Sequence, residues 1–331
     1  MWYDNVLAGL IIRKKEDKEM KLVTFEPAPG CERLGIWFGH YVLDLALARD
    51  AYEKRTRSEI HEIPHDMMAF LEQGELSLSA AKEVAEWAQA LFEKTGKVTG
   101  VSGDVISYKA DEVRLRAPVP KPPKILCLAL NYVAHADEGD NVVPEKPYVF
   151  IKPGFRPVVG PNDKVFRVPQ SQNFTFEGEL AVVIGKRCRF VPREKAYEVV
   201  AGYTAVNDMS ARDLGKTRVN QFDWFQVKAF DSSLPMGPCL VLKDEIDDPH
   251  NLRLTVRVNG KTAQDASTGE MVFKIPEIIE FISDLITLDP GDIIATGTPG
   301  GSKGALKAGD KVEVEIMNIG VLSNVIADRD G

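Results

Sequence analysis

Four prolines stand within seven residues in the segment APVPKPP, Ala117–Pro123. Proline removes a backbone hydrogen-bond donor, and each X-Pro bond favours extended backbone for the residue before it. Neither a regular helix nor a central strand is expected to run through such a segment. We therefore predict a domain boundary here, with a small N-terminal domain over residues 20–117 and a larger C-terminal domain over residues 118–331. Residues 1–19 are predicted to form an N-terminal extension.

The chain after the prolines is rich in short apolar runs separated by turn residues. Lys124–Leu130 and Leu252–Val258 have the length and composition of strands, and Asn259-Gly260 after the second run is typical of a hairpin turn. A short amphipathic helix is predicted to start at Pro276. Many strands and few helices predict an α+β, mainly β architecture for this domain, and not a doubly wound sheet.

The domain before the prolines has a different pattern. Strand-like runs at Lys21–Glu26, Arg33–Phe38 and Tyr41–Asp44 are followed by helical segments. The apolar residues of Ser79–Lys94 recur at the spacing of one helix face, which predicts a helix with Ser79 as its N-cap and Gly96 as its C-cap. We expect a smaller α/β domain whose residues serve packing, because no pattern in it demands chemistry.

Charge and cysteine content exclude several classes of partner. The chain of 331 residues has a formal net charge of −8, and it has no basic block of the kind that binds nucleic acid or anionic membranes. No apolar run approaches the roughly 18 residues of a membrane-spanning helix. The basic residues near the N-terminus follow the apolar patch, which is the reverse of a secretory signal. Four widely spaced cysteines indicate free thiols in a reducing compartment, so we expect a cytoplasmic protein.

Two glutamates stand one residue apart in the stretch FEGELAVVIG, Phe176–Gly185. Side chains two residues apart in a strand point to the same face, so Glu177 and Glu179 are predicted to be neighbours. The continuously apolar run that follows them predicts a strand covered on both faces. Two unpaired carboxylates at the start of this strand would repel each other and lose solvation. Three interpretations stay open: exposure at the end of the strand, pairing with arginine or lysine, or binding of a metal.

A third acid bears on this choice. Asp208 follows another strand-like run, Gly202–Val206, in a stretch dense with polar residues. Three carboxylates without a nearby histidine or cysteine make an all-oxygen set, which suits Mg²⁺, Mn²⁺ or Ca²⁺ and not zinc. The spacing alone favours metal binding no more than the other two interpretations.

Three further segments carry groups that could assist chemistry. In NYVAHADE, residues 131–138, His135 and Glu138 would be neighbours on a helix, and a carboxylate beside an imidazole raises its basicity. A surface histidine beside a surface acid is the alternative interpretation. Lys228 would be an ordinary solvated lysine unless it lies near a metal, where it could stabilise an oxyanion. The glycine-rich stretch Gly297–Gly301 could present backbone donors to an anion.

These segments together resemble the fumarylacetoacetate hydrolase family, and most closely its longer domain-containing members of prokaryotic and mitochondrial type. The matching stretches occur in order and cover nearly all of residues 119–328. They are NYVAHADE (131–138), FEGELAVVIGK (176–186), AGYTAVNDMSARD (201–213), KAFDSSLPMGP (228–238), VNG with STGEMVF (258–273) and LDPGDIIATGTPGG (288–301).

The resemblance implies a β-roll catalytic domain, a homodimer, and Mg²⁺ or Mn²⁺ in the mouth of the roll. It implies that Glu177, Glu179 and Asp208 are the metal ligands. His135 and Glu138 match a pair that activates water, carried on a lid over the substrate. The substrate-contacting lysine matches Lys228, and the remaining predicted substrate contacts are Asn131, Arg212 and Thr298.

The reaction implied by the resemblance is hydrolysis of a carbon–carbon bond in a 2-oxo acid of the acylpyruvate or fumarylpyruvate type, through an enolate stabilised by the cation. One alternative is an isomerase or decarboxylase acting on an enol diacid of the 2-hydroxyhepta-2,4-diene-1,7-dioate or oxaloacetate type. A non-catalytic binding protein on the same fold is another. The sequence departs from the family pattern at Gly215, where many members have glutamine as a substrate contact, and we expect Gln221 or Gln226 to be the only nearby substitutes.

Overall fold

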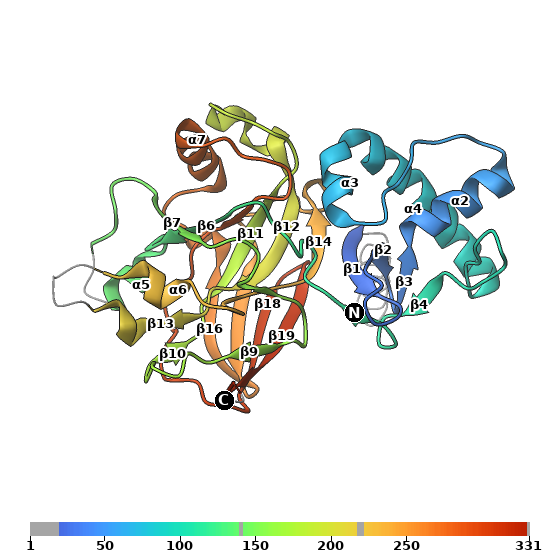
Figure 1. Ribbon diagram of the computed structural model, residues 1–331. Coiled ribbons are helices and arrows are strands. Elements are labelled where there is room, and N and C mark those ends of the chain that lie inside the picture. The colour runs from blue at the N-terminus through green and yellow to red at the C-terminus, as the bar shows by residue number, and fades with distance from the viewer. Residues whose placement is uncertain (1–19, 139–141, 217–221, 330–331) are drawn as a thin grey trace, which may run out of the picture. The chain divides into compact units, whose positions relative to one another are not determined.

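The computed structural model describes residues 20–138, 142–216 and 222–329 (Figure 1). The extension predicted for residues 1–19 lies outside these ranges. The chain divides into two compact units between Leu115 and Arg116, just before the proline-rich segment. Within the described residues, no helix is long and apolar enough to cross a membrane.

The first unit is a small sheet with helices. Its strands follow the order β4-β3-β2-β1 and are antiparallel, and β5 also pairs with β1. The three strand runs that we expected here are confirmed as β1, β2 and β3. The bounds are β1 Lys21–Glu26, β2 Arg33–Phe38, β3 Tyr41–Asp44, β4 Ser107–Lys109 and β5 Arg114–Leu115, with helices α2 Leu45–Thr56, α3 Met67–Gln73 and α4 Glu75–Thr95.

The long helix of this unit begins earlier than the sequence predicts. Gly74 alone separates α3 from α4, so α4 starts at Glu75 and Ser79 lies inside the helix. The prediction of Ser79 as an N-cap is therefore wrong, because the helix continues directly from the preceding one. The predicted C-cap is confirmed: Gly96 adopts a left-handed φ of 70° and its N–H donates to Phe92 O.

The second unit is built on two sheets. The first has the order β14-β12-β11-β17-β6-β7, antiparallel except for the pair β17 and β6. Every residue of β11 is buried, as its continuous apolar run predicts. The strands are β6 Ile125–Ala129, β7 Tyr148–Lys152, β11 Gly178–Ile184, β12 Val200–Asn207, β14 Leu234–Leu242 and β17 Ile293–Ala295, with β8 Val158–Val159 parallel to β14.

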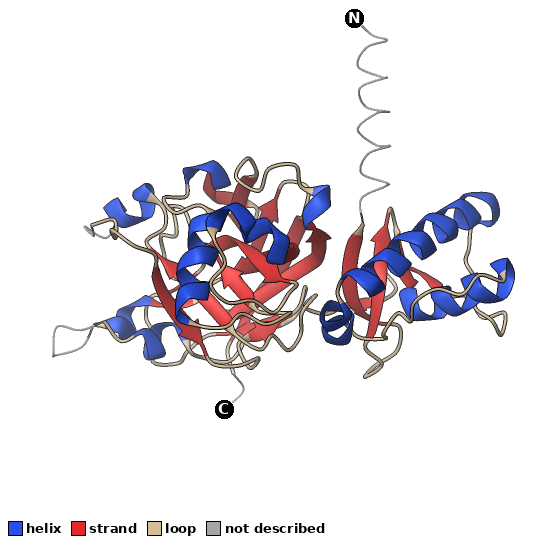
Figure 2. Cartoon of the chain, turned by 90° about the horizontal axis from the view of Figure 1, so that it is seen from above, coloured by secondary structure: helices blue, strands red, loops and turns tan. Residues whose placement is uncertain are grey.

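The second sheet has the order β16-β15-β18-β19-β9, and short helices and loops surround the strands of this unit (Figure 2). The mixed, strand-rich α+β class is confirmed. The sheet strands are β9 Lys164–Phe166, β15 Arg253–Val258, β16 Lys261–Ser267, β18 Lys311–Ile316 and β19 Gly320–Ala327. A separate pair joins β10 Phe174–Thr175 to β13 Ser210–Ala211, and the α-helices are α5 Val133–Glu138, α6 Trp224–Lys228 and α7 Ile275–Leu285.

The two sheets approach closely at Gly178, the residue between the two glutamates. A Cβ on Gly178 would lie 2.4 Å from Val256 Cγ2 and 3.2 Å from Val314 Cγ1, both in the second sheet. Only glycine fits this distance. Because consecutive residues of extended chain point to opposite faces, Glu177 and Glu179 point away from the second sheet.

Candidate active site

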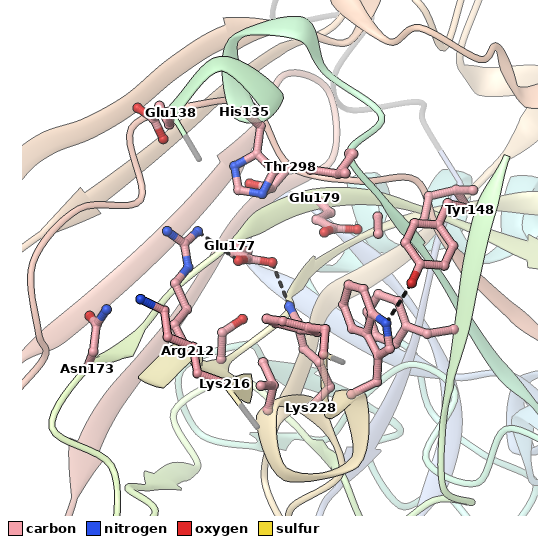
Figure 3. Close-up of a pocket in the computed structure, with 18 residues that line it drawn as sticks. His135, Glu138, Tyr148, Asn173, Glu177, Glu179, Arg212, Lys216, Lys228 and Thr298 are labelled. Atoms are coloured by element: carbon pink, nitrogen blue, oxygen red, sulfur yellow. Dashed lines mark hydrogen bonds and ion pairs between the residues drawn. The ribbon is translucent and has the colours of Figure 1, made fainter. Parts of the chain in front are cut away.

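A cavity of about 610 Å³ opens at the end of β6 and the start of β11 in the second unit. Titratable and aromatic side chains line it, and Figure 3 labels several of them. The titratable residues are His135, Glu138, Glu177, Glu179, Arg212, Lys216 and Lys228, and the aromatic residues besides His135 are Tyr148, Phe150, Phe222 and Trp224.

The structure brings the three predicted metal ligands together. Glu177, Glu179 and Asp208 are all buried, and each offers a carboxylate oxygen within 4.8 Å of the others. Backbone pairing sets this geometry, since Asp208 N donates to Glu177 O at 2.7 Å where β12 ends beside β11. Glu177 N in turn donates to Oδ1 of Asn207 at 2.9 Å.

Two cationic side chains bind Glu177. Lys228 Nζ lies 2.6 Å from Glu177 Oε2 and 2.5 Å from Asp208 Oδ2, and Arg212 Nη2 lies 2.9 Å from Glu177 Oε1. Burial by itself would raise the pKa of Glu177, but Lys228 and Arg212 outweigh it and hold the pKa well below its usual value. Burial would likewise lower the pKa of Lys228, yet Asp208 and Glu177 raise it, so the ammonium stays charged.

Sequence reasoning missed a second buried lysine. Lys152 Nζ lies 2.8 Å from Asp208 Oδ1, and it donates to Lys228 O at 2.7 Å and to Ser233 Oγ at 3.1 Å. It therefore holds both a predicted ligand and the backbone of the other lysine. The sequence pattern that could have revealed Lys152 is the alternation of strand residues in Tyr148–Lys152. This alternation puts Lys152 on the same buried face as Phe150.

Glu179 has a different environment. Its Oε2 accepts a hydrogen bond from Gly297 N at 2.8 Å, and no ion pair joins it to a cation within the described residues. Burial, followed by the negative charge of Asp208, raises the pKa of Glu179 well above its usual value. The carboxylate form of Glu179 therefore lacks a positive partner within the described part of the protein.

This arrangement fits a divalent cation. The donor set is entirely oxygen, as Mg²⁺ and Mn²⁺ prefer, and a cation among Glu177, Glu179 and Asp208 would supply the missing positive partner of Glu179. Three carboxylates face the three cationic side chains of Lys152, Lys228 and Arg212, so the ionised cluster is balanced by itself. With a divalent cation added, two positive charges remain.

His135 reaches the cavity from α5, and its imidazole points towards the carboxylates (Figure 3). Its Nδ1 is buried, and among the described residues it has no hydrogen-bond partner. Burial, together with the positive charges of Arg212 and Lys228, lowers the pKa of His135 against the opposing effects of Glu177 and Glu138. The imidazole is therefore neutral near pH 7 and can accept a proton.

The predicted partner of His135 is bound elsewhere. Glu138 Oε1 accepts from Gly301 N at 2.8 Å and lies 3.4 Å from Lys303 Nζ. Within the described part of the chain, no hydrogen bond joins Glu138 to His135. The glycine-rich stretch does present backbone donors, as the sequence suggested, but Gly297 and Gly301 present them to the protein's own carboxylates.

The predicted substrate contacts differ from one another. Arg212 lines the cavity, and Thr298 also borders it, with a hydroxyl that donates to Gly178 O at 3.0 Å and accepts from Gln264 Nε2 at 2.9 Å. Asn131 does not border the cavity. Its amide donates to Phe273 O and Thr296 O and accepts from Phe273 N, so the structure uses it to join loops.

Of the two candidate substitutes for the missing glutamine, only Gln226 is described, and it does not border the cavity. Gln221 lies outside the described residues, and the exposed Gln226 donates to Asp223 Oδ2 at 2.7 Å. The space beside Gly215 is filled instead by an aromatic ring. A Cβ on Gly215 would lie 2.5 Å from Phe222 Cε2 and 2.8 Å from Val227 Cγ2.

Comparison with known proteins identifies relatives along the whole chain. Residues 124–327 match the family model described as fumarylacetoacetate (FAA) hydrolase, C-terminal. Oxaloacetate tautomerase FAHD2B, mitochondrial, of Bos taurus is 38% identical over 93% of this chain and 92% of its own. Oxaloacetate tautomerase YisK of Bacillus subtilis is 41% identical over 81% of this chain and 88% of its own.

Solved structures show the same fold. A fumarylacetoacetate hydrolase from the psychrophilic Exiguobacterium antarcticum has a TM-score of 0.72 at 31% identity, covering 94% of this chain and 100% of its own. A maleylpyruvate hydrolase from Sphingobium sp. SYK-6, in complex with manganese(II) ion and pyruvate, has a TM-score of 0.66 at 30% identity, covering 93% and 99%.

Proposed function

The chain belongs to the fumarylacetoacetate hydrolase family of enzymes, and we propose that it is a divalent-metal-dependent keto–enol tautomerase of a 2-oxo diacid of the oxaloacetate type. The observation that carries the proposal is the isolated imidazole of His135. It faces the three carboxylates with its pKa lowered, and its predicted carboxylate partner is bound to Gly301. A base of this kind suits removal of a proton from carbon, which needs no activated water.

The charge of the site supports a dicarboxylate substrate. Lys152, Lys228 and Arg212 balance the three acids, so a divalent cation leaves two positive charges beside the cavity. Oxaloacetate carries two negative charges near pH 7. Complementary net charge favours its entry and its retention in a site shielded from water.

The reaction moves one proton and consumes nothing else. Glu177, Glu179 and Asp208 would hold a divalent cation, which would supply Lewis-acid polarisation of the 2-oxo group. His135 accepts the proton when the C3–H bond breaks, and the 2-oxo oxygen gains a proton when the O–H bond of the enol forms. Lys152 and Lys228 hold the acids in place, while Arg212 binds Glu177 through Nη2 and can offer its other N–H groups to a substrate carboxylate.

The test follows the enol absorbance of oxaloacetate in ultraviolet light. We expect added protein with Mg²⁺ or Mn²⁺ to accelerate the approach to keto–enol equilibrium, and excess chelator to abolish the acceleration. His135→Ala should lose about a hundredfold or more, which is the usual contribution of a general acid–base group. No acceleration with either metal would overturn the proposal, and product analysis separates tautomerisation from decarboxylation.

Carbon–carbon bond hydrolysis, the first interpretation of the sequence, is the second candidate. Glu138 stands on the same helix as His135, one turn further on, and its charge acts to raise the pKa of His135. A shift of Glu138 from Gly301 to His135 would form the pair that activates water. The maleylpyruvate hydrolases among the related structures support this alternative. Release of pyruvate from an acylpyruvate, lost in Glu138→Gln, would favour it.

Three other expectations stay predictions. The choice between Mg²⁺ and Mn²⁺ is open because the donor set suits both. The homodimer and the cytoplasmic location rest on the sequence alone, and several relatives are named as mitochondrial. A non-catalytic binding role is disfavoured by the assembly of acids, lysines and imidazole around one cavity, and the oxaloacetate experiment decides it.

A further inference from the structure

Four aromatic residues that line the cavity form a cluster beside Lys228, whose Nζ lies 5.5 Å from the centroid of the Phe150 ring. Trp224 stacks on Phe150, with ring centroids 4.5 Å apart and an interplanar angle of 15°. Phe222 packs at 4.7 Å from Trp224, and Tyr148 meets it edge-on at 5.6 Å while accepting a hydrogen bond from Trp224 Nε1 at 2.9 Å. A preformed apolar surface thus faces the cavity. It is formed by β7, the first turn of α6 and Phe222 just before that helix.

Gly215 makes this surface possible. A side chain at this position would meet the ring of Phe222 within 3 Å, so glycine is what allows the ring to pack. Phe222 keeps 48% of its surface exposed and Tyr148 keeps 44%, and both border the cavity. The part of the site where a polar substrate contact was expected is therefore apolar.

The cavity is also large for a four-carbon diacid. Its volume of about 610 Å³ lies within the range of roughly 300–1,000 Å³ typical of sites for drug-sized ligands. Tyr148 lies apart from Glu177, Arg212 and His135 in the cavity (Figure 3). A 2-oxo acid head held at the acids and Arg212 leaves room for a flat apolar group against the rings.

We propose that the same site also tautomerises 2-oxo acids that carry an aromatic group on C3, the arylpyruvates. This inference rests on the proposed tautomerase function and adds a substrate class to it. His135 takes the proton as the C3–H bond breaks, the 2-oxo oxygen gains one as the enol O–H bond forms, and no other reactant is consumed. The aromatic group lies against Tyr148 and Phe222, where stacking of rings adds to the gain from apolar burial.

The experiment compares phenylpyruvate with oxaloacetate in the metal-loaded protein, following both enols by ultraviolet absorbance. Wild type is expected to accelerate both. In Phe222→Ala, the ratio of kcat/KM for phenylpyruvate to kcat/KM for oxaloacetate should fall about tenfold, the loss expected for one ring contact. Phe225→Ala is the matched control, because Phe225 lies on the adjoining helix α6, is 71% exposed and does not border the cavity. In Phe225→Ala, the ratio of the two kcat/KM values should stay within about twofold of the wild-type ratio.

The outcomes separate this inference from the proposed function. Acceleration of oxaloacetate without phenylpyruvate would overturn the aromatic substrate class and leave the diacid tautomerase standing. Failure with both substrates would overturn both. Equal falls of the ratio in Phe222→Ala and Phe225→Ala would show that the aromatic cluster does not recognise the substrate.

Discussion

Two sides of the acidic cluster hold their carboxylates by different means. On the cationic side, Glu177 and Asp208 bind the side chains of Lys152, Lys228 and Arg212. On the glycine side, Glu179 and Glu138 accept hydrogen bonds from the backbone N–H groups of Gly297 and Gly301. The cationic side neutralises its acids inside the protein, whereas the glycine side offers only partial charges to Glu179.

The difference assigns separate tasks to neighbouring glutamates. Paired charges on the cationic side fix its geometry with or without a metal, because breaking a buried pair is costly. Glu179 is held above its usual pKa, so its ionisation opposes folding near pH 7 until a cation is present. The cationic side therefore supports the fold, and we expect Glu179 to couple the site to a bound cation.

The largest effect should come from replacing each glutamate with glutamine. Glu177→Gln and Glu179→Gln should both lower metal-dependent turnover about a thousandfold, since each removes a charged ligand worth several kcal/mol to the reaction. Their stabilities without metal should differ. Denaturant unfolding in chelator should show Glu177→Gln less stable by about 3 kcal/mol, because Lys228 and Arg212 lose a partner.

Glu179→Gln should unfold in chelator at the wild-type denaturant concentration or above it, because an acid with a raised pKa is replaced by a neutral group. Equal destabilisation by both substitutions would contradict the division between the two sides. Metal titration followed by calorimetry supplies the independent check, with weak binding expected in both variants.

The cationic side can be tested next through Lys152. Lys152→Met should lower the free energy of unfolding by about 2 kcal/mol, because Asp208 Oδ1 loses its ion pair while Asp208 Oδ2 keeps Lys228. The exposed Lys164 is the control, and Lys164→Met should change stability by less than about 0.5 kcal/mol. A neutral effect of Lys152→Met would mean that the lysine only fills space.

On both sides of this comparison, the sequence predicts the acids better than it predicts the groups that hold them. The period of two in the strand makes Glu177 and Glu179 neighbours, and the resemblance to the family adds Asp208 as the third ligand. Lys152 was missed because β7 and β12 are not neighbours in the sheet, so no strand-pairing pattern in the sequence brings Lys152 to Asp208. The contact between Glu138 and Gly301 spans 163 residues and involves a backbone donor, which no side-chain pattern reveals.

The same limit explains the remaining errors in the fold and the site. Strand runs in the first unit could be bounded from their composition, whereas the start of α4 depended on the single-residue break at Gly74. From the sequence, Gly215 indicated that a polar substrate contact is lost. In the structure, the ring of Phe222 fills the space beside Gly215, and the sequence does not reveal this packing.

The pH dependence of turnover tests whether the positive charges of the cationic side act on His135. Burial and the charges of Arg212 and Lys228 lower the pKa of His135. His135 is therefore still neutral at pH values near 6.5, the ordinary pKa of imidazole. The rate should stay constant as pH falls through about 6.5 and decline about tenfold per unit only below the lowered pKa. An acidic limb of kcat/KM with its midpoint above about 6.5 would show that a carboxylate governs His135 in the working enzyme.

The smallest effect is expected on the glycine side, at Glu138. A glutamine there keeps a side-chain oxygen that can accept from Gly301 N, so Glu138→Gln should change oxaloacetate tautomerisation by no more than about threefold. His135→Ala is the reference, with its loss of about a hundredfold or more. A comparable loss in Glu138→Gln would mean that the carboxylate leaves Gly301 to pair with His135 during catalysis. The glycine side would then be a resting position of Glu138, and activation of water for hydrolysis would become the better account of the site.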